Sequence, residues 1–147
     1  MLSSIFDAKT DAIVNPVNIV GVMGKGLALE FKIKYPDNFK AYLGACRAGK
    51  IKIGKVFTYD LGTGETPRYI INFPTKAHWK YPSTLEYIEQ GLVSLIDEVE
   101  SLGIDSIAVP ALGCGLGGLS WVDVQARIIR AFNKIPHVNL VLIHPLA

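Results

Sequence analysis

The sequence predicts one α/β domain in which helices cover both faces of a central sheet. Short apolar segments alternate with segments of helical periodicity, and the expected central strands are apolar throughout. Two glycine-rich loops each stand between a strand and a helix. The chain has 147 residues, of which 50% are hydrophobic and 19% are charged, as is typical of one domain. Because no repeat or linker is visible, we expect a single domain over residues 1–147.

The first third of the chain predicts a strand and two helices. Residues 12–15 form an apolar run before Pro16, which indicates a buried strand that ends in a turn. Apolar residues then recur at helical spacing over residues 27–35, after the first glycine loop. A second short helix is expected over residues 38–48, where the apolar side chains share one side and Gly49 ends the run.

The middle of the chain predicts two strands and the longest helix. Strands are expected over residues 56–61 and 69–73, joined by a polar turn and possible neighbours in the sheet. Residues 84–102 follow the 3.6-residue period of a helix, and Ser83 with Glu86 has the spacing of an N-terminal capping box. We therefore expect Ser83 to cap this helix.

The last third predicts a strand, a helix and a final strand, over residues 106–110, 121–133 and 139–144. The second glycine loop lies between the first two of these elements. In layered α/β domains, binding sites lie at the carboxyl ends of strands. Both glycine loops are therefore expected to lie at the functional end of the sheet.

The glycine loops, residues 21–26 and 113–118, indicate a site for a diphosphate. Glycine lets the backbone approach a phosphate closely, and the free amides of a helix N-terminus stabilise its charge. The alternative is that both are only tight turns. The spacing Gly113-x-Gly115-x-x-Gly118 matches a dinucleotide fingerprint, but the acidic residue required about 20 positions later is missing. The first loop is not a Walker loop, because neither Ser nor Thr follows Lys25.

Composition excludes several classes of protein. The formal net charge is only +2, although residues 25–55 are locally basic and could form either a solvated face or a flank that attracts phosphates. Two cysteines and three scattered histidines give no sign of a disulfide framework or a metal site. No leader and no apolar run of about 20 residues is visible, so we expect a cytoplasmic protein without a membrane segment.

Three segments together resemble the macrodomain family. They are AIVNPVN at 12–18, GVMGKGLA at 21–28 and VPALGCGLG at 109–117. The resemblance covers almost the whole chain and implies a three-layer α/β/α fold with a mixed, mostly parallel sheet that binds ADP-ribose. The first loop, together with PTKAHWKYPS at 74–83, is most similar to the macrodomain of DarG-type antitoxins. These are DNA ADP-ribosyl glycohydrolases that remove ADP-ribose from thymidine in single-stranded DNA.

The resemblance also implies functional residues. Lys80 matches the family's catalytic lysine, and Asn18 would lie at the ribose distal to adenine. His78, Trp79 and Tyr81 are candidates to contact DNA, although Trp79 could equally pack under the loop. The residues expected to surround ADP-ribose are Asn18, Val22, Met23, Gly24, Lys25, Gly26, Leu27, Gly113, Cys114, Gly115, Leu116 and Gly117. No metal or cofactor is implied.

Two departures from the family bear on specificity. Ser4 stands where many macrodomains have an Asp that binds the adenine amine, so adenine recognition is open. Gly117 stands where related ester hydrolases place an acidic residue, which favours activity on DNA. Cys114 is expected to fill a tight turn, whereas Met23 and Leu116 are expected either to cover the diphosphate or to fill the core.

The neighbours of Lys80 in the sequence also favour a catalytic role for its amine. It lies near Lys76 and near the positive end of the helix at 84–102, and both would lower the pKa of its amine. The amine could then attack the anomeric carbon or, if charged, assist the departing thymine. The sequence leaves both roles open.

Other functions remain alternatives to DNA glycohydrolysis. They are hydrolysis of ADP-ribosyl esters or O-acetyl-ADP-ribose, non-catalytic ADP-ribose binding and, remotely, a dinucleotide-dependent oxidoreductase. The resemblance implies a DNA ADP-ribosyltransferase toxin as the partner, bound through a C-terminal region outside residues 1–147. It leaves open whether these residues are a domain excised from a longer chain.

Overall fold

A central five-stranded sheet organises the computed structural model, which describes residues 4–145. Its spatial order is β2-β3-β1-β4-β5, and only the pairing of β2 with β3 is antiparallel. The strands are β1 (Ala12–Asn18), β2 (Phe57–Asp60), β3 (Tyr69–Lys76), β4 (Ser106–Val109) and β5 (Asn139–Leu142). The mixed, mostly parallel sheet is therefore confirmed, with β2 and β3 as neighbours.

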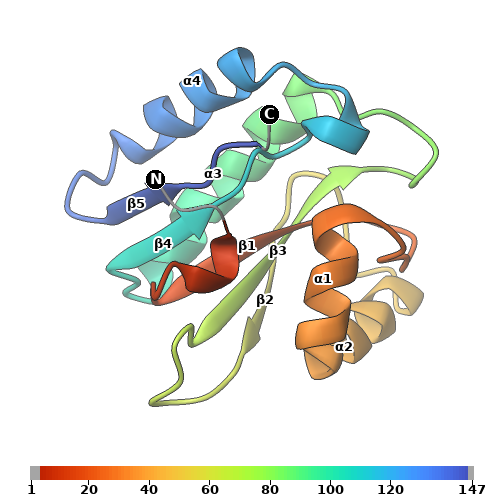
Figure 1. The fold of residues 1–147 in the computed structure, drawn as a ribbon, viewed down its shortest axis with the longest axis horizontal. Helices are drawn as coiled ribbons and strands as arrows, with labels where there is room; N and C mark the ends of the chain where they lie inside the picture. The colour runs from red at the N-terminus through yellow and green to blue at the C-terminus, as the bar shows by residue number, and fades with distance from the viewer. Residues whose placement is uncertain (1–3, 146–147) are drawn as a thin grey trace.

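Helices cover both faces of this sheet (Figure 1). On one face lie α1 (Gly26–Lys34) and α2 (Pro36–Arg47), and on the other lie α3 (Leu85–Ser101) and α4 (Trp121–Phe132). Alternate side chains of β1 serve the two faces, since Val14 packs in the α3–α4 core and Ile13 packs with Phe31 of α1. The three-layer α/β/α fold is confirmed. Two short 3₁₀ helices, η1 (Ile5–Asp7) and η2 (Gly115–Gly117), were not predicted.

The predicted ends of β1 and β3 are wrong, because both strands run further than the sequence suggested. β1 continues through Pro16 to Asn18, and β3 continues through Pro74 to Lys76. Pro16 is tolerated because β4 pairs with β1 only at Ala12 and Ile13, so the edge of β1 beside Pro16 has no ladder with β4. The extension carries Asn18 and Lys76 to the carboxyl end of the sheet as register partners.

Helix α3 is capped by Thr84 and not by Ser83. The Thr84 hydroxyl accepts a hydrogen bond from the Tyr87 amide at 3.2 Å. Ser83 instead donates its own amide to the carbonyl of Gly117 at 3.0 Å, which turns its side chain beneath the second glycine loop. The predicted cap is therefore one residue too early. Helix α2 begins at Pro36, two residues before its predicted start, because a proline in the first turn of a helix needs no N–H partner.

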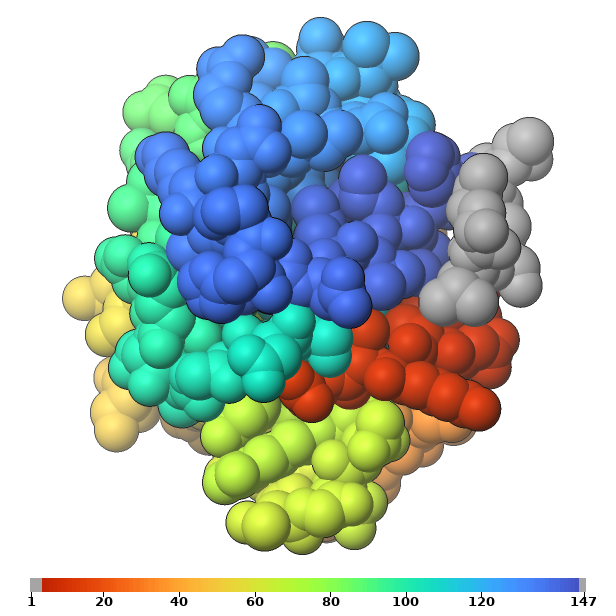
Figure 2. Space-filling view, turned by 90° about the vertical axis from the view of Figure 1, so that its left-hand side faces the viewer, coloured from red at the N-terminus to blue at the C-terminus, as the bar shows by residue number. Residues whose placement is uncertain are grey.

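The amino ends of the parallel strands are joined around Asp11. Its carboxylate accepts hydrogen bonds from the amides of Asp105 and Ser106, and its carbonyl accepts from those of Arg68 and Tyr69. Figure 2 shows this end of the molecule, where the segments leading into β3, β4 and β5 lie side by side. No helix within residues 4–145 has the length and hydropathy needed to cross a membrane.

Replacement of Gly91 by Ala tests how closely α3 packs on the sheet. A Cβ at this position would overlap the ring of Phe73 in β3. We expect Gly91→Ala to lower the free energy of unfolding by about 1–3 kcal/mol, measured by urea denaturation. Gly44→Ala is the matched control, because Gly44 is in α2 with open space around it. That change should raise stability by up to about 1 kcal/mol, and equal effects of the two would contradict the packing described.

Candidate functional site

Three segments meet at the carboxyl end of the sheet. The first glycine loop follows β1, the second follows β4, and residues 77–84 follow β3. Because β1 lies between β3 and β4, these segments are neighbours in space (Figure 1). The Cδ1 of Leu116 in the second loop lies 3.4 Å from the point that a Cβ of Gly26 would occupy, so the two loops touch.

The first loop is held by the side chain of Asn18. Its Oδ1 accepts hydrogen bonds from the amides of Val20 at 3.1 Å and Val22 at 3.3 Å, and its Nδ2 donates to the Val22 carbonyl at 2.7 Å. The Tyr42 hydroxyl lies 2.7 Å from the Asn18 carbonyl and 2.8 Å from Oδ1. Asn18 is thus engaged within the protein, and its predicted position at the distal ribose stays a prediction.

Burial keeps the Tyr42 hydroxyl protonated. Burial, together with the neighbouring Cys46, raises the pKa of the Tyr42 hydroxyl far above its ordinary value. The hydroxyl therefore keeps its proton and remains a donor to Asn18. A Cβ on Gly21 would lie 2.8 Å from the side chain of Leu43, so the loop also packs closely on α2. Sequence reasoning did not single out Tyr42.

The apolar residues of the first loop divide between core and surface. Met23 is 1% exposed and packs with Val17 and Tyr42, so its side chain fills the core and cannot cover a ligand. Val22 is 39% exposed at the rim. Lys25 precedes α1 without a side-chain cap, so the first amides of α1 are free to bind an anion.

The second loop is built on backbone contacts. The Leu119 amide donates to the Gly113 carbonyl at 2.9 Å, and the Gly117 carbonyl accepts from Ser83. A Cβ on Gly113, whose φ is +73°, would lie 2.7 Å from Leu119, so glycine is needed there for both conformation and space. Leu116 is 65% exposed, so it lies on the surface beside the first loop and not in the core.

Cys114 is half-buried, and burial raises the pKa of its thiol. A neutral thiol fits the predicted role of filling a turn.

Lys76 is the lysine that contacts the second loop. It ends β3 opposite Asn18, where the register shifts by one residue. Its Nζ donates to the carbonyl of Leu116 at 3.1 Å and lies 3.5 Å from that of Trp79. The ion pairs within residues 4–145 are Arg68–Asp60 and Arg127–Glu89, so the Lys76 amine is in no ion pair there. Lys76 lies three residues beyond the predicted end of this strand at Phe73, so the sequence prediction, which ended β3 too early, did not single it out.

Lys80 contacts an aromatic cluster formed by His78, Trp79 and Tyr81. Its ammonium stands over the Trp79 ring, 5.2 Å from the centroid. The His78 ring lies 5.1 Å from Trp79 and 5.4 Å from Tyr81, and its Nδ1 accepts the Lys80 amide at 3.1 Å. Trp79 and Tyr81 are 48% and 62% exposed, so Trp79 is not packed under the loop.

The amino-terminal Ser4 has a structural partner. Its hydroxyl accepts from the Phe6 amide at 3.3 Å and caps η1. Adenine recognition by Ser4 stays open.

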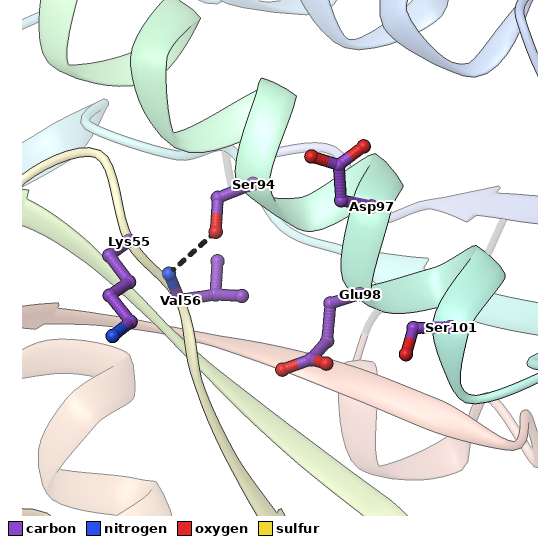
Figure 3. A pocket seen from close by; sticks show the side chains of 6 residues that line it. All are labelled: Lys55, Val56, Ser94, Asp97, Glu98 and Ser101. Atoms are coloured by element: carbon purple, nitrogen blue, oxygen red, sulfur yellow. Dashed lines mark hydrogen bonds between the residues drawn. The ribbon is translucent and has the colours of Figure 1, made fainter.

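A separate hollow of about 310 Å³ lies beside α3 (Figure 3). There, the Ser94 hydroxyl accepts from the Val56 amide at 3.0 Å, and Glu98 accepts from the Thr58 hydroxyl at 2.8 Å. These polar side chains attach the segment before and within β2 to the helix. No residue of the glycine loops lines the hollow. Ser94 and Glu98 in it serve to attach β2 and the segment before it to α3, so we assign the hollow no binding role. Among residues 4–145, no group of three or more His, Cys, Asp or Glu side chains could hold a metal ion.

Comparison with known proteins identifies relatives of the whole chain. The sequence model of the Macro domain family matches residues 14–128. The chain is 53% identical over 138 residues to a DNA ADP-ribosyl glycohydrolase of Mycobacterium tuberculosis and 48% identical over 142 residues to one of Thermus aquaticus. These alignments cover 94% and 97% of this chain but 39% of each relative. The chain therefore spans about two fifths of the length of these relatives.

Solved structures agree with this assignment. The macrodomain of M. tuberculosis DarG superposes with a TM-score of 0.96 at 50% identity, covering 100% of this chain and 96% of that one. Thermosipho africanus DarTG in complex with ADP-ribose superposes with a TM-score of 0.89 at 36% identity, covering 97% of this chain and 40% of that one. A protein of the same organism is named a DNA ADP-ribosyl transferase-DNA ADP-ribosyl glycohydrolase fusion, and the alignment covers 88% of this chain and 37% of that protein.

Removal of the Asn18 side chain tests how the first loop is held. Asn18→Ala deletes the acceptor of two loop amides, and we expect hydrogen exchange at Val20 and Val22 to accelerate by about 10-fold or more. The measurement is amide exchange followed by NMR. Amides of the second loop serve as the internal control, because Asn18 has no hydrogen bond with that loop. Unchanged exchange at Val20 and Val22 would contradict the described role.

Proposed function

The chain belongs to the Macro domain family, and from this membership we propose that it is a DNA ADP-ribosyl glycohydrolase. The proposed substrate is single-stranded DNA with ADP-ribose on thymidine. Hydrolysis breaks the bond between the thymine nitrogen and the distal ribose, water supplies the hydroxyl of free ADP-ribose, and thymine regains a proton. The observation that carries the proposal is the meeting of two glycine loops and a lysine amine beside an exposed aromatic cluster.

The relatives support this choice of reaction. Proteins 48–53% identical to the chain are named DNA ADP-ribosyl glycohydrolases. The fusion relative links such a domain to a DNA ADP-ribosyl transferase. We therefore propose that the protein works in the cytoplasm as the antitoxin of a DNA ADP-ribosyltransferase toxin. Contact with the toxin is assigned to a region beyond this domain.

The diphosphate of ADP-ribose is proposed to lie between the two loops. Free amides at the start of α1 and in η2 supply hydrogen-bond donors without a competing carboxylate. Val22 on the first loop and Leu116 on the second are exposed apolar side chains that would cover the diphosphate. A chain that is 36% identical was solved in complex with ADP-ribose, which supports this ligand.

The amine that acts on the distal ribose is proposed to be that of Lys76. Lys76 is the register partner of Asn18, and its amine reaches the second loop. An amine at this position can attack the anomeric carbon or stabilise the departing thymine. Lys80 is the alternative implied by family resemblance, but its ammonium stands over Trp79. The two lysines are separable by experiment.

The modified thymine is proposed to stack on the aromatic cluster of His78, Trp79 and Tyr81. Exposed rings next to Lys80 combine a surface for stacking with a positive charge for the DNA backbone. The basic segment 25–55 adds a flank that attracts the strand.

Single substitutions of the two lysines test the function and the assignment together. With a thymidine-ADP-ribosylated oligonucleotide, we expect wild type to release ADP-ribose and Lys76→Ala to be slower by about 100-fold or more. Lys80→Ala should release ADP-ribose within about 5-fold of wild type. Calorimetry should show that all three proteins bind ADP-ribose. Loss of release in the Lys80 variant alone would contradict the role of Lys76 and support that of Lys80.

The same assay separates the alternative functions. Release from ADP-ribosylated protein esters or O-acetyl-ADP-ribose, without release from DNA, would identify an ester hydrolase. Binding of ADP-ribose without release from any substrate would identify a non-catalytic binding module. Either result contradicts DNA glycohydrolysis.

Substitution of Trp79 tests recognition of the base. We expect Trp79→Ala to raise KM for the oligonucleotide by about 5-fold or more, because base stacking on an aromatic ring is lost. The affinity for free ADP-ribose should not change. Trp79→Phe is the matched control, since it keeps a ring face and should recover part of the loss. Equal weakening of DNA and ADP-ribose binding would contradict a base contact.

A further inference from the structure

We propose that Ser83 is a positioning residue for the amine of Lys76, an inference that rests on the proposed function. When ADP-ribose lies between the two glycine loops, the Ser83 hydroxyl accepts a hydrogen bond from this amine and holds it toward the distal ribose. It then replaces the Leu116 carbonyl that accepts from Lys76 in the free protein.

The Ser83 hydroxyl is buried and has no hydrogen-bond partner among residues 4–145. The residue is 5% exposed, and its Oγ makes no hydrogen bond in the structure. An unpaired buried hydroxyl lowers stability, so it needs an explanation. Helix capping does not explain it, because Thr84 caps α3. Attachment of the second loop does not explain it either, because that bond uses the Ser83 amide.

Lys76 is the flexible polar side chain next to this hydroxyl. Oγ of Ser83 lies 2.7 Å from the point that a Cβ of Gly117 would occupy, and Cε of Lys76 lies 3.9 Å from the same point. Rotation of the lysine side chain can therefore bring its amine toward the hydroxyl. A lysine amine carries up to three N–H donors, so it can donate to Ser83 and still contact the ribose.

Because residue 117 is glycine, it places no charged side chain beside Ser83 and Lys76. Any side chain at position 117 would meet Ser83 and have to displace it. A carboxylate therefore cannot enter beside Lys76 from this position without disturbing the loop. A neutral hydroxyl holds the amine without the strong attraction of an acid, which would pull it away from the substrate.

Binding of ADP-ribose explains why the Lys76 amine would change its acceptor from the Leu116 carbonyl to the Ser83 hydroxyl. The Leu116 carbonyl belongs to the loop proposed to receive the diphosphate, so its bond to the amine competes with the bound arrangement. Ser83 lies beneath the loop, at the start of the long helix α3, and is fixed by its amide. It can thus hold the amine while the loop adjusts to the ligand.

Ser83→Ala tests the proposal without removing a hydrogen bond of the free protein. The bond from residue 83 to Gly117 uses the backbone and remains. We expect kcat for release from the oligonucleotide to fall by about 10-fold, with KM and ADP-ribose affinity within about 2-fold of wild type. The midpoint of thermal unfolding should stay the same or rise. Unchanged kcat in an active protein would overturn the proposal, as would a parallel loss of ADP-ribose affinity.

Thr84→Ala is the matched control at the neighbouring position. It removes the cap of α3 and should lower the midpoint of thermal unfolding, with kcat unchanged. If both substitutions lower stability and kcat together, Ser83 acts structurally and the proposal fails.

An NMR measurement of the Lys76 amine keeps the test independent of turnover. Exchange of the Lys76 ammonium protons with water is measured with saturating ADP-ribose, with Lys76→Arg used to assign the signal. A hydrogen bond to the Ser83 hydroxyl slows this exchange, so Ser83→Ala should accelerate it by about 3-fold or more. Equal exchange rates in the two proteins overturn the proposal, whether or not wild type acts on DNA. Absence of turnover by wild type contradicts only the proposed function.

Discussion

The parallel pairing of β1 with β3 is the constraint on which the rest of the site depends. Asn15 and Asn72 are register partners, both fully buried, and the Nδ2 of Asn15 donates to the Oδ1 of Asn72 at 3.1 Å. Asn72 also exchanges hydrogen bonds with Asn38, which connects the pair to α2. A shift of one residue would leave these buried amides unpaired, and the resulting cost selects a single register. That register places Asn18 opposite Lys76.

The sequence predicted what depends on local patterns. Apolar runs located all five strands, glycine located both loops, and the helical period located α3 almost to the residue. It failed where a tertiary contact overrides a local preference. Pro16 continues a strand because β1 pairs with β3 at this position, while β4 does not pair beside it. Ser83 does not cap α3, since its amide donates to the Gly117 carbonyl and Thr84 is the cap. Both errors concern strand or helix ends, where propensity is weakest.

The same limit explains why the sequence did not select Lys76. Its position follows from how far β3 extends, which depends on pairing with β1 and not on the residues of β3 alone. Tyr42 was missed for a similar reason, since its hydroxyl reaches Asn18 from another layer of the fold. A local pattern cannot reveal a partner 24 positions away.

The two loops are held in different ways, and this difference matters for binding. The first is attached by three hydrogen bonds to one buried side chain, that of Asn18, which is itself held by Tyr42. The second is attached by one backbone bond to Ser83, just before α3, and by the bond from the Lys76 amine to the Leu116 carbonyl, and its Leu116 side chain is exposed. A loop with fewer buried contacts opens at lower free energy. In the proposed complex the first loop is therefore the preformed side of the site. The second is the side that adjusts when the Ser83 hydroxyl replaces the Leu116 carbonyl as the acceptor from Lys76.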